Sequence, residues 1–276
     1  MGDYRQPTRL EEALEALARP CTVLAGGTDF YPARVGRAID EDILDISRIK
    51  SLAGISCDGA GWRLGATTTW SELLAADLPP LFDGLKQAAR EVGGRQIQNV
   101  GTLAGNLCNA SPAADGVPPL LALDAEVELA SRDKVRRLPL SEFIVGNRRT
   151  RLSSDELLVA IHVPGPATIA RSSFLKLGAR RYLVISIVMA AATIEIAEDR
   201  VRAARVAVGA CSAVAQRLPV LEAALAGAPI DARLAERVEP AHLAPLRPID
   251  DVRGSASYRL DAAVTLLRRL LAGLAS

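Results

Sequence analysis

The chain has 276 residues, more than one domain usually contains, so we expect two domains. Its 33 basic and 32 acidic residues give a net charge of +1, which argues against nucleic acid or acidic lipid as partners. With 49% hydrophobic and 24% charged residues, the composition is that of an ordinary folded protein and excludes a disordered or fibrous one.

The cysteines and histidines argue against a metal site in this chain. None of the four cysteines forms the close pair that zinc or an iron–sulfur cluster usually requires, so we expect free thiols (Cys21, Cys57, Cys108 and Cys211). The two histidines, His162 and His242, are too few for a histidine-rich site. The chain also lacks the ~18 uninterrupted apolar residues of a membrane-spanning helix. We therefore expect no membrane insertion and a cytoplasmic location.

The first half of the chain predicts helices and strands in alternation. Thr8 and Glu11 have the spacing of a capping box, which predicts a helix that ends before Pro20. Residues 21–29 and 42–47 are short apolar runs that predict strands. Residues 61–74 predict a strand that turns into a helix, with Thr69 and Glu72 forming a second capping box.

The second half predicts a domain of strands followed by helices. Residues 156–164 alternate apolar side chains on one face, which predicts a strand, and the prolines after it make 164–170 the expected linker. Residues 186–196 and 201–212 predict an antiparallel hairpin, and 220–227 and 258–275 predict helices. We expect the leucines of the last helix to pack inside the protein (Leu266, Leu267, Leu270 and Leu274).

Two glycine-bearing loops indicate a phosphate ligand. The first is "VLAGGTDF", residues 23–30, and the second lies within residues 93–120, where no charged residue occurs from Gln96 to Ala114. Glycine lets backbone amides approach a ligand closely, and consecutive amides form anion-binding concavities. The glycines concerned are Gly26, Gly27, Gly101 and Gly105, with Thr28 and Thr102 as further donors.

The pattern of "AGGT" alone is also that of an ordinary tight turn, and this alternative stays open on the residues alone. Neither of the common phosphate-binding fingerprints is present, since no Gly-x-x-x-x-Gly-Lys-[Ser/Thr] occurs. The stretch "GAGWRLG" at 59–65 misses Gly-x-Gly-x-x-Gly by one position and predicts a hairpin turn.

Four motifs taken in order resemble the flavoprotein subunit of molybdenum hydroxylases, the family of xanthine dehydrogenase and carbon monoxide dehydrogenase. They are "LAGGTDF" (24–30), "GGRQIQNVGTLAGNLCNASPAAD" (93–115), "FLKLGARR" (174–181) and "GSASYR" (254–259), and they span almost the whole chain. The resemblance implies an α+β fold. An FAD-binding domain of the vanillyl-alcohol-oxidase type, residues 1–166 with subdomains of about 1–56 and 57–166, would precede a smaller C-terminal domain, residues 170–276.

The resemblance also implies which residues contact FAD. The first loop would surround the diphosphate with backbone amides (Val23, Leu24, Ala25, Gly26, Gly27, Thr28, Asp29 and Phe30). The second loop would supply the rest of the cradle (Thr102, Leu103, Ala104, Gly105 and Asn106). Ala104 stands where a second glycine is usual, which a negative φ allows. Asp115 corresponds to a flavin-site aspartate, Leu158 to an apolar contact and Lys176 to a lysine near the cofactor.

The chain departs from the commoner pattern after "GARR", where relatives often carry an aspartate and this chain has Tyr182, Leu183 and Val184. The polar role at that position is therefore not carried over, and whether Tyr182 approaches the flavin stays open. The chain also lacks the cysteine-bearing insertion of the branch that reduces aromatic acyl-CoA esters, which argues against that branch.

By resemblance, the chain is an electron-transfer subunit of a molybdenum-dependent complex and carries no catalytic acid or base of its own. A large subunit with the molybdenum cofactor and a small subunit with two [2Fe–2S] clusters would be its partners, in a dimer of heterotrimers, that is, a heterohexamer. Electrons would pass from the clusters to FAD and on to NAD⁺, oxygen or another acceptor. Two alternatives stay open: a stand-alone flavin oxidase or dehydrogenase, and a non-catalytic nucleotide-binding subunit.

Overall fold

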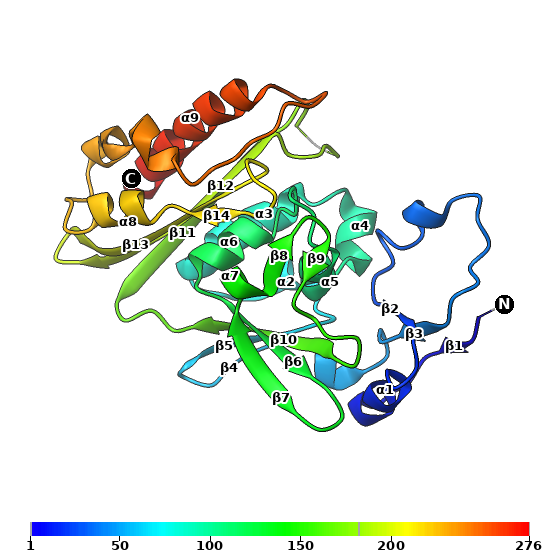
Figure 1. Ribbon diagram of the computed structural model, residues 1–276. Helices are drawn as coiled ribbons and strands as arrows, with labels where there is room; N and C mark the ends of the chain where they lie inside the picture. Colours follow the sequence, from blue (N-terminus) through cyan, green and yellow to red (C-terminus); the bar gives the residue numbers. More distant parts are fainter. Residues whose placement is uncertain (1, 182, 276) are drawn as a thin grey trace.

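The N-terminal lobe is built on a small parallel sheet. The computed structural model (Figure 1) describes residues 2–181 and 183–275. Strands β1 (Tyr4–Arg5), β3 (Ile43–Asp45) and β2 (Thr22–Leu24) lie side by side in that order, and helix α1 (Leu10–Ala16) packs beside them. The short 3-10 helices η1 (Pro32–Arg34) and η2 (Lys50–Leu52) follow β2 and β3. Both predicted strands of this lobe are confirmed.

The first helix exists, but its predicted cap is wrong. Arg9, not Thr8, is the residue that precedes the helix, and its side chain makes no capping hydrogen bond. Thr8 instead donates its backbone N–H to Glu12 Oε2 at 3.3 Å. The helix ends before Pro20, as expected, because proline has no N–H to continue the ladder.

A five-stranded antiparallel sheet forms the centre of the first half of the chain, residues 2–164. Its order is β4 (Ile55–Cys57), β5 (Gly61–Gly65), β10 (Leu157–Pro164), β6 (Glu126–Ala130) and β7 (Val135–Pro139). The predicted hairpin at 59–65 and the predicted strand at 156–164 are confirmed. A two-stranded ribbon, β8 (Ile144–Gly146) and β9 (Arg149–Thr150), lies beside this sheet (Figure 1).

Short helices cover the inner face of this sheet. They are α2 (Trp70–Ala75), η3 (Pro80–Phe82), α3 (Asp83–Glu91), α4 (Arg95–Val100), α5 (Leu103–Asn109), α6 (Val117–Ala122) and α7 (Leu140–Phe143). The capping box of Thr69 and Glu72 is present in full at the start of α2. The uncharged stretch 96–114, predicted as a loop, folds mainly into α4 and α5. Leu103 and Leu107 of α5 are fully buried, whereas α4 has no buried residue.

The C-terminal half contains an antiparallel sheet between two layers of helices. Its strands are β11 (Ile169–Leu177), β12 (Val188–Ala197), β13 (Arg200–Gly209) and β14 (Gln216–Arg217), so the predicted hairpin is confirmed. Helices α8 (Pro219–Leu225) and α9 (Ala256–Ala275) lie on one face, together with η4 (Ala232–Arg237) and η5 (Pro240–Leu243) (Figure 1). The leucines of α9 are buried there, which confirms internal packing of this helix.

The other face of the C-terminal sheet packs on the first half of the chain. Helix α3 contacts β11, and α6 contacts β12 and β13. A Cβ on Gly84 would lie 3.0 Å from the backbone of Ser173, so glycine permits the close approach of α3. Residues 165–168 connect β10 of one sheet to β11 of the other. Two sheets therefore share helices α3 and α6 between them.

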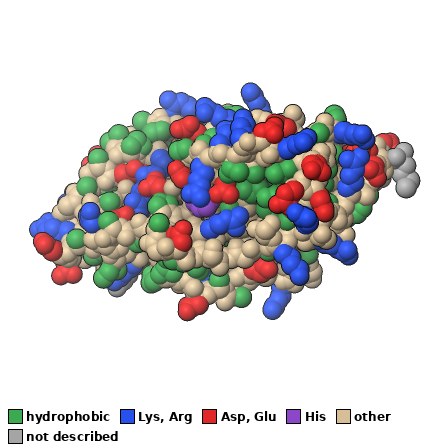
Figure 2. All heavy atoms as spheres, turned by 90° about the horizontal axis from the view of Figure 1, so that it is seen from below, with side chains coloured by type: hydrophobic (Ala, Val, Ile, Leu, Met, Phe, Trp, Pro, Cys, Tyr) green, Lys and Arg blue, Asp and Glu red, His purple; other side chains and the backbone are tan. Residues whose placement is uncertain are grey.

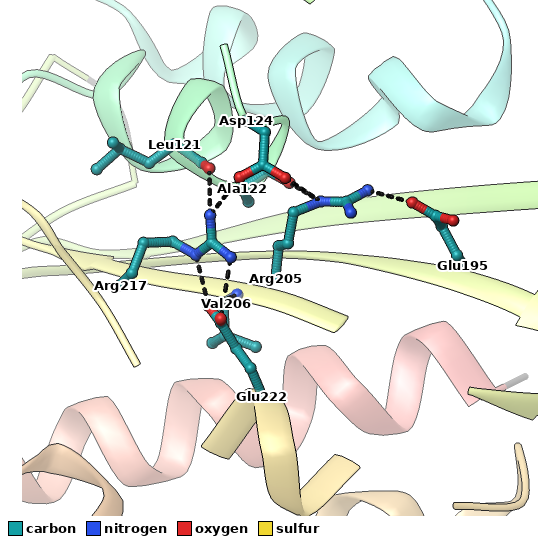
Figure 3. Close-up of polar contacts among 8 residues, drawn as sticks. All are labelled: Leu121, Ala122, Asp124, Glu195, Arg205, Val206, Arg217 and Glu222. Atoms are coloured by element: carbon teal, nitrogen blue, oxygen red, sulfur yellow. Dashed lines mark hydrogen bonds and ion pairs between the residues drawn. The ribbon is translucent and has the colours of Figure 1, made fainter. Parts of the chain in front are cut away.

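Charged groups reinforce this contact (Figure 3). Arg205 and Arg217, from β13 and β14, both pair with Asp124, which follows α6. Their guanidinium groups also donate to carbonyl oxygens at the end of α6 and to two acids of the C-terminal half (Leu121, Ala122, Glu195 and Glu222). The two halves are thus connected by a network in which each arginine has several acceptors.

The surface shows no segregation of charge on the face drawn in Figure 2, where acidic and basic side chains are interspersed around hydrophobic ones. Within the described residues, no helix combines the length and the apolar character that crossing a bilayer needs.

Candidate functional site

A cavity of about 480 Å³ lies where the N-terminal lobe meets helices α4 and α5. Most of the residues that the sequence nominated line it (Val23, Leu24, Ala25, Gly26, Gly27, Thr28, Asp29, Phe30, Thr102, Ala104, Gly105, Asn106 and Leu158). Three nominated residues do not line it: Leu103, Asp115 and Lys176. The structure therefore brings the two glycine-bearing segments together at one cavity.

Glycine permits the close approach of these two segments. A Cβ on Gly26 would lie 1.9 Å from the backbone oxygen of Val100, far inside any real contact. Gly27 has φ +70°, a conformation that side chains disfavour, and a Cβ there would meet the ring of Tyr31 at 2.6 Å. The "GG" pair is required by the backbone itself, because no other residue fits at either position without displacing a neighbour.

The first segment presents a row of unpaired backbone donors. Among the described residues, none accepts a hydrogen bond from the N–H groups of residues 25–30. Its carbonyl groups are used, since Gly27 O accepts from Tyr31 N–H at 3.1 Å and Asp29 O accepts from Ala33 N–H at 3.3 Å. Consecutive free N–H groups at a cavity wall attract an anion. This arrangement fits a phosphate ligand better than an ordinary turn.

The second segment is organised by Thr102, which precedes α5. Its Oγ1 accepts a hydrogen bond from Gly105 N–H at 3.0 Å, and its carbonyl accepts from Asn106 N–H at 3.1 Å. Ala104 lies inside α5, so its backbone has the negative φ that alanine needs. Leu103 is fully buried in the core, and its N–H donates to Thr68 O at 3.0 Å. Its neighbours reach the cavity and Leu103 does not.

Several cavity residues were missed by the sequence analysis. The guanidinium of Arg34 lies 3.8 Å from the centre of the Phe30 ring and donates to Phe30 O at 3.0 Å. Arg34 also pairs with Glu41, and this hydrogen bond lowers the pKa of Glu41. Arg148 reaches the cavity from the β8–β9 turn and donates to Asn109. The cavity wall therefore includes two cations that no glycine motif marks.

Asp115 and Lys176 form a buried ion pair away from the cavity lining. Asp115 Oδ2 lies 2.7 Å from Lys176 Nζ, and Asp115 Oδ1 accepts from Ser186 Oγ at 2.6 Å. Burial raises the pKa of Asp115, although the ammonium of Lys176 and the two hydrogen bonds lower it. Asp115 belongs to the first half of the chain, whereas Lys176 and Ser186 belong to the C-terminal half. Ser186 was missed because its role depends on this contact between distant segments.

Tyr182 lies outside the described residues, so whether it approaches a flavin stays open. On its C-terminal side, Leu183 has φ +53°, and a Cβ on Gly94 would lie 3.4 Å from its side chain. The segment that carries Ser186 therefore passes close to the start of α4.

These observations fit FAD. Its diphosphate needs hydrogen-bond donors and nearby positive charge, and the free N–H groups of residues 25–30 supply the donors beside the cations Arg34 and Arg148. Its rings need apolar walls, which Leu158 and Trp70 provide.

Comparison with known families agrees with this geometry. Residues 1–166 match the family model described as the FAD binding domain in molybdopterin dehydrogenase, and residues 173–274 match the CO dehydrogenase flavoprotein C-terminal domain. The chain belongs to this flavoprotein family. The resemblance that the four motifs indicated is thereby confirmed, as is the α+β organisation with an FAD-binding domain before a C-terminal antiparallel sheet.

Similar proteins cover almost the whole chain. The putative xanthine dehydrogenase FAD-binding subunit XdhB of Escherichia coli (strain K12) is 29% identical, over 98% of this chain and 94% of that protein. The structure of carbon monoxide dehydrogenase from Hydrogenophaga pseudoflava has a TM-score of 0.86 at 26% identity, covering 98% of this chain and 96% of the other. Quinoline 2-oxidoreductase from Pseudomonas putida 86 has a TM-score of 0.87 at 27% identity, covering 100% and 97%. The chain is an FAD-binding oxidoreductase subunit of the xanthine and CO dehydrogenase type.

Proposed function

We propose that this chain is the FAD-carrying electron-transfer subunit of a molybdenum-dependent hydroxylase or dehydrogenase complex. It accepts electrons from [2Fe–2S] clusters of a small partner subunit and passes them to NAD⁺ or another acceptor, while a large subunit holds the molybdenum cofactor. The names of similar proteins support this division, since they include the medium chain of carbon monoxide dehydrogenase and the medium subunit of nicotine 6-hydroxylase. A dimer of heterotrimers and a cytoplasmic location stay predictions.

The observation that carries the proposal is the row of free N–H groups at residues 25–30, in a segment that lines a cavity against α5. We assign these groups to the FAD diphosphate, with further polar contacts from Thr102, Gly105 and Asn106. Leu158 and Trp70 exclude water from the ring-binding part of the cavity. Residues 1–166 form the FAD-binding domain in this proposal, and residues 170–276 form the second domain.

Each remaining nominated residue has a role that its surroundings allow. Leu103 anchors the second segment to the protein core, because its side chain is buried there and its N–H donates to Thr68 O. Asp115 and Lys176 lie at the contact of the two halves and do not line the cavity, and we propose that this contact forms the flavin side of the site. Bound FAD supplies the redox chemistry, exchanging one or two electrons, so that the protein contributes binding, orientation and exclusion of water.

Comparing flavins of different length tests the phosphate assignment without altering the protein. FAD, FMN and riboflavin are titrated into the cofactor-free chain, and binding is followed by flavin fluorescence. We expect FAD to bind at least about tenfold more tightly than riboflavin, because riboflavin has no phosphate for the free amides. Equal affinity of FAD and riboflavin would refute the assignment. A flavin spectrum that bleaches with NADH would further identify the acceptor.

A substitution of Gly26 tests the same assignment from the protein side. Gly26→Ala places a methyl group against Val100 O, so the two segments must move apart and FAD affinity should fall at least about tenfold. Gly273→Ala is the control, because nothing lies within 4 Å of a Cβ there. Unchanged FAD affinity in a folded Gly26→Ala protein would show that the closeness of the two segments does not matter for binding.

A further inference from the structure

Arg259 is a buried arginine that donates to three groups of the C-terminal half. It lies in the first turn of α9 with only 3% of its surface exposed. Its Nη1 donates to Ile187 O at 2.6 Å and to Ala210 O at 3.1 Å, and its Nη2 donates to Asp251 Oδ1 at 2.7 Å. Its Nε has no partner among the described residues. The two terminal nitrogens therefore set the orientation of the guanidinium.

The carbonyl of Ile187 is the informative acceptor, because residues bonded to or next to Ile187 in turn contact or adjoin the two members of the buried ion pair. Ser186, the residue before it, donates its hydroxyl to Asp115 Oδ1. The N–H of Ile187 itself donates at 2.8 Å to the carbonyl of Leu177, the residue after Lys176. This segment thus holds Ser186 against Asp115 and extends the pairing of β12 with β11, the strand that carries Lys176. A displacement of Ile187 changes the surroundings of both charged groups.

Asp251 keeps the guanidinium in place. Its Oδ1 also accepts from Arg253 N–H at 2.8 Å, and Asp251 and Gly254 exchange backbone hydrogen bonds at 3.2 Å in both directions. The turn that contains Asp251 therefore fixes the position of its carboxylate independently of Arg259. Burying an arginine carries a desolvation cost that these bonds must offset, so a structure retains it where orientation matters.

We propose that Arg259 is a positioning residue for the flavin site, acting through Ile187 and Ser186 on the Asp115–Lys176 pair. The inference rests on the proposed function, since it takes that pair to lie on the flavin side of the site. Arg259 contacts no part of the cavity itself. Its effect on FAD is therefore indirect, and it must disappear when the connection through Ser186 is removed.

The test uses the whole chain in four forms: wild type, Arg259→Met, Ser186→Ala and the double variant. Two quantities are measured: amide hydrogen exchange of residues 183–187 without cofactor, and FAD affinity by fluorescence titration. We expect Arg259→Met to raise the exchange of this segment at least about tenfold and to weaken FAD binding about tenfold. The double variant should bind FAD about as tightly as whichever single variant binds FAD less tightly, because the two residues act in one sequence of contacts.

Arg268→Met is the matched control. Arg268 lies on the same helix and also donates to a main-chain carbonyl, Val238 O, at 3.2 and 2.9 Å. It should leave FAD affinity and the exchange of residues 183–187 within about twofold of the wild type. Arg259→Lys keeps the charge and one donor to Ile187 O, and it should recover part of both effects. Asp251→Asn should give the same pattern with smaller changes. It replaces Arg259→Met in the test if that variant does not fold.

The outcomes are separable. Normal exchange at residues 183–187 in Arg259→Met would overturn the positioning role, whether or not FAD binds. Raised exchange with unchanged FAD affinity would overturn the connection to the flavin site. Effects of Arg259→Met and Ser186→Ala that multiply in the double variant would overturn the route through Ser186. A wild-type chain that binds no FAD would refute the proposed function, while the exchange data would still decide whether Arg259 positions the segment.

Discussion

Two ion pairs in this protein, each with a buried carboxylate, have opposite electrostatic character. Glu156, 2% exposed, accepts from Arg136 Nε at 2.6 Å and Nη2 at 2.7 Å and from Ser153 N–H at 3.0 Å. These bonds, led by that of Arg136, lower its pKa to about 2. Asp115, 8% exposed, has only Lys176 and Ser186 as partners, and burial raises its pKa. The same kind of pair thus favours the charged carboxylate in one place and penalises it in the other.

The difference indicates different roles. The Glu156 pair lies at β7 and the start of β10, where two parallel bonds from one guanidinium compensate for desolvation and stabilise the fold. The Asp115 pair lies between the two halves of the chain, where its bonds do not outweigh burial. A carboxylate kept with a penalised charge is typical of a site that contacts another charged or polar group. We therefore assign folding stability to the Arg136 pair and propose that the Lys176 pair acts in cofactor binding.

The largest effect should come from removing the arginine of the stabilising pair. Arg136→Met leaves Glu156 buried and charged, and we expect the free energy of unfolding in urea to fall by about 3 kcal/mol. FAD affinity should not change. Arg151→Met is the control, because its pair with Glu142 is exposed on both sides and is worth about 1 kcal/mol or less. If Arg136→Met lost no more unfolding free energy than Arg151→Met, the stabilising role of the Arg136–Glu156 pair would be contradicted.

Removing the lysine of the other pair should cost less stability and more binding. In Lys176→Met, Asp115 can take up a proton readily because its pKa is already raised, so we expect a stability loss of about 1 kcal/mol. FAD affinity should fall about tenfold, measured by fluorescence titration at pH 7. The proposed difference between the two pairs would be contradicted if Lys176→Met lost more stability than Arg136→Met and still bound FAD with normal affinity.

The two carboxylates should also respond to pH with opposite signs. Because the pKa of Glu156 falls from its ordinary 4.5 to about 2, its stabilisation is complete above pH 4.5 and is lost as the pH falls toward 2. Because the pKa of Asp115 is raised, its contribution is complete below its ordinary pKa of 3.8 and is lost as the pH rises through the folded-state value. Urea midpoints between pH 5 and pH 3 should therefore decline less in Glu156→Gln than in the wild type. Parallel curves for the two proteins would contradict the assignment.

The sequence predicted those features of the fold that depend on neighbouring residues. The alternation at 157–163 and the leucine spacing of α9 specify a strand and a helix whatever lies beside them. Helix N-caps were predicted less reliably from the sequence. Thr69 and Glu72 form a capping box, whereas Thr8 and Glu11 have the same spacing and form none, because the helix begins one residue later, after Arg9. The spacing alone does not determine where the backbone turns into the helix.

The site was predictable only where backbone chemistry marks it. The glycines of the first segment are visible in the sequence, but its contact with Val100 is not, since the two lie on separate elements. Arg148 enters the cavity from a turn with no motif, and Ser186 acquires its role only by meeting Asp115 across the two halves. Residues of this kind depend on tertiary packing, which no local pattern encodes.

The account depends most on the free N–H groups of residues 25–30 binding the FAD diphosphate. A crystal structure of the chain grown with excess FAD tests this directly. We predict diphosphate oxygens within hydrogen-bond distance of several of these nitrogens, with the cofactor in the cavity between the first segment and α5. A diphosphate located elsewhere on the chain, with these nitrogens bonded only to water, would contradict the account.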